Sequence, residues 1–93
     1  MSLTLQNPLK DPSAVLDYVF DWNEWLATGE TITDHTITAD TGITVDSSTE
    51  DDGKVTVWLS GGTAGTTYRV ECLITTTAGR TDERSLWITV QER

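Results

Sequence analysis

The residue types that most often carry chemistry are scarce in this chain. Among its 93 residues there is one histidine, His35, and one cysteine, Cys72. A single histidine cannot by itself build a histidine-based metal site, and His35 lies in a stretch with strand character, so we interpret it as a surface or bulge residue. Cys72 alternates with apolar neighbours, which favours an inert core thiol over a reactive one. A lone cysteine also excludes an internal disulfide and fits synthesis in a reducing compartment.

Serine, glycine and carboxylate patterns indicate no reaction either. Ser60 lacks the preceding glycine that a nucleophile elbow needs, and residues 60–65 lack the lysine of a phosphate-binding loop. Residues 46–53 are rich in oxygen ligands, but Asp51 stands where an EF-hand loop requires glycine. A glycosidase needs two carboxylates about 5 to 9.5 Å apart across a cleft, and so short a chain with its acids in turns offers no evident cleft. The sequence therefore predicts no catalytic residue, no metal site and no cofactor.

Tryptophan is unusually frequent for so small a chain. Four tryptophans are more than the core of one small domain requires. If the residues on either side of Trp58 face a core, Trp58 faces outward, and the same alternation places Trp87 and Leu73 outward. Exposed aromatic side chains anchor interfaces, so these three residues are candidate contact residues. The alternative is that residues 1–14 fold back and cover one of the tryptophans.

Charge and length limit the possible partners. Fifteen acidic residues against six basic ones give a formal charge of −9. Such a chain repels phosphate backbones and anionic membrane surfaces, so neither nucleic acid nor membrane is an expected partner. A chain of 93 residues without a long apolar run indicates one domain. We find no apolar block that resembles a secretion signal near Met1.

The elements that position these residues are predicted to be β-strands. Apolar residues alternate with polar ones along several segments, a period of two that is typical of half-buried strands. Glycine, serine, threonine and aspartate gather between these segments and favour turns. The predicted strands cover residues 15–22, 30–39, 43–45, 55–59, 68–74 and 86–90.

Two departures from regular strands are expected. Ile32 and Ile37 differ in parity, so a bulge near Asp34 and His35 would restore the register of their strand. Residues 46–53 are the most polar stretch and are predicted to form a loop.

Local signals also predict the turns. Asp21 or Asn23 is expected to cap a single helical turn over residues 24–27. Gly79 is expected to adopt a positive φ, and the side chain of Arg80 beside it is expected to contribute little to stability.

Six short strands separated by turns predict an all-β fold, a β-sandwich. The order resembles a fibronectin type III or related immunoglobulin-like domain, with the first, second and fourth strands in one sheet and the third, fifth and sixth in the other. The prolines Pro8 and Pro12 disfavour a strand in the opening segment. The predicted organisation is an N-terminal arm, residues 1–14, followed by the sandwich domain, residues 15–93.

A closer resemblance extends from about Asp11 to Val90. Its most specific parts are two runs, Trp58-Leu59-Ser60-Gly61-Gly62-Thr63-Ala64-Gly65-Thr66 and Gly79-Arg80-Thr81-Asp82-Glu83-Arg84. On these runs the chain resembles a family of small proteins from tailed bacteriophages and prophages, described as virion structural proteins and often as fiber-tail adaptor proteins. The resemblance implies a non-enzymatic role in assembly.

The leading hypothesis is therefore a phage or prophage virion structural protein, an assembly or adaptor subunit at the neck or tail. It would be synthesised in the bacterial cytoplasm, act through contacts with other virion proteins, and could close into a ring. The alternative is an Ig-like adhesion or carbohydrate-binding module with loop aromatics that stack on sugars, which is less favoured because Trp58 and Trp87 lie within strands. Replacing Trp87 is expected to weaken association more than replacing Trp58. The candidate interface residues are Trp87, Leu73, Trp58, Arg80, Asp82 and Arg84, the last three in one loop.

Overall fold

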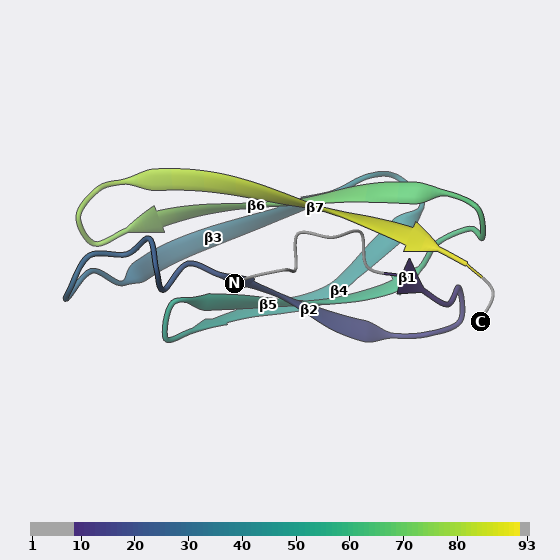
Figure 1. Ribbon diagram of the computed structural model, residues 1–93, viewed down its shortest axis with the longest axis horizontal. Coiled ribbons are helices and arrows are strands. Elements are labelled where there is room, and N and C mark those ends of the chain that lie inside the picture. The colour runs from purple at the N-terminus through teal and green to yellow at the C-terminus, as the bar shows by residue number, and fades with distance from the viewer. Residues whose placement is uncertain (1–8, 92–93) are drawn as a thin grey trace.

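Two layers of β-strands make up the protein (Figure 1). The computed structural model describes residues 9–91, with Leu9 described by its backbone alone. The strands are β1 (Leu9–Lys10), β2 (Leu16–Asp21), β3 (Ile32–Ala39), β4 (Ile43–Asp51), β5 (Lys54–Gly61), β6 (Thr67–Thr76) and β7 (Thr81–Val90). The predicted β-sandwich is confirmed.

The sheet order differs from the predicted one. One sheet has the order β1-β7-β6-β3 and the other β2-β5-β4. β3 therefore pairs with β6, and β4 pairs with β5, so the second and third predicted strands exchange sheets. The prediction was wrong because alternation reveals which side of a strand is buried and not which strand lies beside it. The immunoglobulin-like type stays a prediction. In its favour, β2-β5-β4 and β3-β6-β7 have the B-E-D and C-F-G orders of that fold when β1 counts as the first strand.

Part of the predicted arm belongs to a sheet. Leu9 and Lys10 pair in parallel with Thr89 and Val90 of β7, where no strand was expected. The Lys10 side chain is fully buried, and its Nζ donates hydrogen bonds to the carbonyl oxygens of Gly61 (2.7 Å) and of the adjacent residue 11 (3.0 Å). β1 thereby ties the end of β7 to the end of β5 in the opposite sheet. The prediction for residues 1–8 lies outside the described residues, and the division at residues 14 and 15 stays a prediction.

The stretch predicted as an acidic loop is mostly strand. β4 continues to Asp51, with a register shift between Val45 and Ser47. Asp52 and Gly53 then form a two-residue hairpin turn with positive φ values of 55° and 82°, the backbone signs of a type I′ turn. β4 is an edge strand, so main-chain pairing with β5 is compatible with polar side chains that stay in water. The loop predicted for residues 46–53 from their polar composition was therefore wrong, because most of this segment is a strand.

Other local predictions are confirmed. A register shift between Ile32 and Asp34 produces the expected bulge in β3. The N–H groups of Trp25 and Leu26 donate to the carbonyl oxygen of Trp22 at 2.9 and 3.0 Å, which closes the expected helical turn. Asp21 caps this turn, since its Oδ1 accepts a hydrogen bond of 2.9 Å from the N–H of Asn23.

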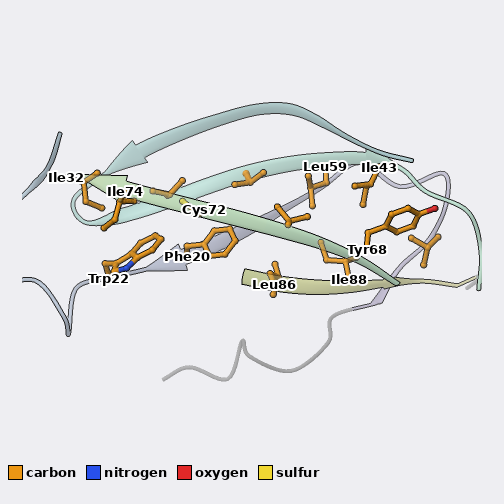
Figure 2. Packing of buried hydrophobic residues seen from close by; sticks show 14 residues of the cluster. Phe20, Trp22, Ile32, Ile43, Leu59, Tyr68, Cys72, Ile74, Leu86 and Ile88 are labelled. Carbon is orange, nitrogen blue, oxygen red and sulfur yellow. The ribbon is translucent and has the colours of Figure 1, made fainter. Parts of the chain in front are cut away.

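The core lies between the two sheets and follows the alternation of the central strands (Figure 2). Tyr68, Val70, Cys72 and Ile74 all face inward from β6, as predicted. At one end of the core, the rings of Phe20 and Trp22 stack with centroids 6.0 Å apart. Other fully buried apolar residues are Val55, Val57 and Leu59 from β5 and Ile88 and Val90 from β7.

Ile74 and Leu73 provide a matched test of the β6 register. Ile74→Ala removes fully buried methyl groups and should lower the free energy of unfolding by about 2 to 5 kcal/mol. Leu73→Ala changes an exposed side chain and should stay within about 0.5 kcal/mol of the wild type. Urea unfolding followed by circular dichroism measures both values. Equal losses for the two variants would contradict the register.

Candidate functional site

Trp58 and Trp87 lie on opposite outer faces of the sandwich. Trp58 projects from the β2-β5-β4 sheet, where it is paired with Asp17 on one side and Ser47 on the other. Trp87 projects from the β1-β7-β6-β3 sheet opposite Arg69. The two residues are 41% and 45% exposed, which confirms the predicted outward orientation. The molecule therefore presents one partly exposed indole on each side.

Polar contacts surround Trp87. The guanidinium carbon of Arg69 lies 5.7 Å from the Trp87 ring centroid, and Arg69 also forms an ion pair with Glu71. The Nε of Arg69 donates a hydrogen bond of 3.1 Å to the Oγ of Ser85. Leu73 is on the same face but pairs with Glu83, so the Glu71–Ser85 row separates it from Trp87. Trp87 and Leu73 are thus two separate apolar spots rather than one patch.

The face around Trp58 has a larger apolar component that sequence reasoning missed. Val19 of β2 is 43% exposed and pairs with Thr56, which makes it a diagonal neighbour of Trp58. Val15, directly before β2, is also exposed. The signal was available, because Val15 and Val19 share the outward parity of Asp17, and Phe20 at the opposite parity is buried.

Arg80 has a structural role, contrary to the expectation for this side chain. Its Nε donates a hydrogen bond of 2.9 Å to Oε2 of Glu30, and its Nη2 donates to Oε1 of the same carboxylate. The Arg80 guanidinium carbon also lies 3.9 Å from the ring centroid of Trp25. Glu30 is buried and accepts a further hydrogen bond from the Oγ1 of Thr76. Arg80, Glu30 and Trp25 therefore join the β6–β7 turn to the segment between β2 and β3.

These contacts shift the acidity of Glu30. Hydrogen bonds from Arg80, then from Thr76 and from the N–H of Ala27, favour the ionised carboxylate and lower its pKa from 4.5 to about 2. Glu30 therefore stays charged in the folded protein at any pH in the physiological range.

Asp82 and Arg84 lie in β7 rather than in a loop with Arg80. β7 begins at Thr81, so the predicted loop is shorter than expected. The Nε1–H of Trp22 donates a hydrogen bond of 2.9 Å to Asp82, and the Arg84 guanidinium carbon lies 4.8 Å from the Trp22 ring centroid. Arg84 also donates to the carbonyl oxygen of Asp21 at 2.8 Å. Both residues thus connect β7 to the end of β2, and a role in partner contact stays a prediction.

The few residues that could react are engaged or buried. Cys72 is fully buried, and burial raises the pKa of its thiol to about 12, so the reactive thiolate is not formed near neutral pH. The Nε2 of His35 shares a hydrogen bond of 3.0 Å with the Oγ of Ser48, which links β3 to β4 across the sheets. Within residues 9–91 there is no group of three or more metal-ligating side chains placed to bind an ion. The same residues include no helix with the length and apolarity to span a membrane.

Comparison with known families agrees with the resemblance seen in the sequence. Residues 10–89 match the family described as "Podophage GP4 fiber-tail adaptor protein gp77". No curated protein matches the chain. Since the match covers most of the chain, the protein belongs to this family of phage fiber-tail adaptors and is a virion structural adaptor subunit that contacts other virion proteins. The family indicates a structural rather than an enzymatic role.

The Glu30–Arg80 pair makes a pH-dependent prediction. The pKa of Glu30 is lower in the folded protein than in the unfolded chain, so the ionised carboxylate adds stability above pH 4.5, and this contribution is lost as the pH falls toward 2. The difference in Tm between the wild type and Glu30→Gln should be largest near pH 7 and shrink between pH 4.5 and 2. Thermal unfolding across this range measures it, with the exposed Glu24→Gln as control. A difference that does not change with pH would refute the assignment.

Arg80 can be tested independently at neutral pH. Arg80→Ala leaves the buried Glu30 carboxylate without its guanidinium partner and uncovers Trp25, so Tm should fall by several degrees. Arg69→Ala removes a surface pair and should have a much smaller effect. Equal Tm values for Arg80→Ala and the wild type would restore the original expectation for Arg80.

Burial of Cys72 predicts slow thiol chemistry. In the folded protein at pH 8, Ellman's reagent should label Cys72 far more slowly than in 6 M guanidinium chloride, because the thiol is both inaccessible and protonated. Release of the coloured thiolate gives both rates. Comparable rates in the two conditions would show that the β6 strand opens readily.

Proposed function

We propose that this adaptor bridges two virion proteins by presenting one outer face of its sandwich to each. The observation that carries the proposal is the position of Trp58 and Trp87 on opposite sheets, both partly exposed. Stacked sheets are about 10 Å apart and their outer faces point away from each other. Two partners bound to these faces would therefore not compete for the same surface.

The exposed indoles give each face a reason to bind. Burying the exposed two fifths of an indole that covers about 200 Å² would yield about 2 kcal/mol at 25 cal/mol per Å². This is a modest amount, which fits an anchor residue supported by polar contacts around it. The sequence predicted that replacing Trp87 weakens association more than replacing Trp58. The bridging proposal instead assigns the two residues to different partners, one on the tail side and one on the fiber side.

A ring of copies is a second arrangement that one observation favours. On its side away from β6, β7 pairs with β1 only at Thr89 and Val90 in the described chain, which leaves the edge from Thr81 to Ile88 available for strand pairing. Repulsion between copies that each carry a charge of −9 opposes close packing at low salt. We therefore favour bridging over a ring of copies, and we place the bridging subunit at the neck or tail of the virion.

The carbohydrate-binding alternative has less support than it had from the sequence. That alternative requires aromatic side chains in loops that can stack on a sugar. The loop aromatics on which it relied are Trp22 and Trp25, in the corner between β2 and β3. Trp22 is fully buried, and Arg80 lies over the ring of Trp25. Neither ring is open for stacking on a sugar.

Single substitutions on each face test the bridging role. Binding to the purified fiber protein and to tails assembled without this adaptor would be measured separately by surface plasmon resonance. We expect Trp58→Ala and Trp87→Ala to keep a near-wild-type Tm, and each to weaken binding to a different one of the two partners by about tenfold or more. Thr28→Ala, an exposed change in the segment between β2 and β3, is the control. Loss of the same partner in both variants, or no loss in either, would contradict the proposal.

A further inference from the structure

Arginine lies over three of the four tryptophans of this protein. In each case the guanidinium carbon is within 6 Å of the ring centroid, which is the range of a cation–π contact. In each case the same arginine also pairs with a carboxylate. The three groups are Trp25 with Arg80 and Glu30 (3.9 Å to the ring), Trp22 with Arg84 and Asp82 (4.8 Å), and Trp87 with Arg69 and Glu71 (5.7 Å).

Trp58 has a neighbouring carboxylate but no arginine over its ring. Asp17 is its direct cross-strand neighbour. On the same face, the Oγ of Ser60 donates a hydrogen bond of 2.8 Å to the Oδ1 of Asp46. No cation of residues 9–91 lies over the Trp58 ring. The nearest basic residue in sequence is Lys54, four residues earlier on β5, where it pairs in register with acidic residues on both neighbouring strands. The indole and the carboxylate are therefore in place, and the cation is missing.

We propose that Trp58 and Asp17 bind an arginine side chain presented by a partner protein. Arginine suits the site better than lysine, because its planar guanidinium can stack on the indole while its N–H groups donate to a carboxylate. The exposed Val15 and Val19 beside it would contact apolar neighbours of that arginine. The charge of −9 would attract a basic partner surface and speed association. This inference rests on the proposed function, since it assumes that the Trp58 face docks a virion protein.

A second copy of the chain is a poor source of this arginine. Arg69, Arg80 and Arg84 each already stack on a tryptophan of their own chain and pair with a carboxylate there. Donating one of them to a neighbouring copy would break an existing contact in order to make an equivalent one. Within residues 9–91 no arginine is left to supply the site, which favours an arginine of a different protein as the occupant.

A direct test uses the free side chain as the probe. The wild-type protein would be titrated with N-acetyl-arginine amide, and the indole N–H signals of the tryptophans followed by NMR, with the Trp58 signal assigned from Trp58→Phe. N-acetyl-citrulline amide has nearly the same shape without the charge and is the matched control. We expect the Trp58 signal to shift with the arginine amide, to shift much less with the citrulline amide, and to lose at least half of its shift in Asp17→Asn. Equal shifts for the two amides, or a larger shift at Trp87 than at Trp58, would overturn the proposal.

The partner that Trp58→Ala loses gives a second test. The arginine amide should compete with that partner, and the citrulline amide should not. Asp17→Asn should weaken binding about two- to fivefold, whereas Asp51→Asn on the same face should change it less than twofold, because Asp51 pairs with Lys54 and not with Trp58.

The two proposals fail in different ways. If the wild type binds neither tail nor fiber protein, the bridging function is wrong, and the amide titration alone decides the arginine site. If Trp58→Ala loses a partner but the arginine amide does not compete, the face docks a protein by other contacts and the arginine proposal is wrong.

Discussion

Alternation along β5 and β6 determines both the core and the exposed residues of this protein. β5 and β6 each have a neighbour on both sides, and their inward residues from Val55 to Leu59 and from Val70 to Ile74 are fully buried. The pleat that buries these residues forces the intervening ones into water. Trp58 and Leu73 are therefore exposed as a direct consequence of the core. The contact surface and the core are two results of the same period of two.

Polar clusters hold the parts that this core does not reach. Lys10 ties β1 to the opposite sheet, Glu30 and Arg80 close the end near the β6–β7 turn, and Asp82 binds the indole of Trp22. Buried ion pairs add little net stability because desolvation offsets their attraction, yet breaking one is costly. We therefore infer that these contacts mainly specify how the connecting segments pack. Together with the Arg69–Glu71 pair, carboxylate contacts engage the arginines of residues 9–91, and none of these arginines lies over Trp58.

An acidic sandwich with an indole on each side suits an adaptor of the phage fiber-tail family. The apolar core packed between the two sheets sets the relative position of their outer faces. The faces are not equivalent, since Trp87 already has Arg69 beside it and Trp58 lies beside Asp17 and the exposed Val19. Such an asymmetry allows two different partners to recognise one small subunit.

Local sequence pattern predicted much of this protein. The register of β6, the outward tryptophans, the bulge in β3 and the turn after Trp22 all follow from neighbouring residues, because strand parity and capping act over a few positions. The runs around Trp58 and Gly79 also pointed to the family. The acidic hairpin could have been found as well, since Asp52-Gly53 is a strong two-residue turn signal that composition concealed.

Other features could not be predicted from local pattern, because they join residues far apart in the chain. No local pattern indicates that β3 pairs with β6, or that Lys10 reaches Gly61. The same holds for Arg80, whose partner Glu30 is 50 residues away, and its structural role became visible only when the two sheets brought these side chains together. Parity could show that Trp58 faces outward, and only the folded structure could show which carboxylates and cations lie around it.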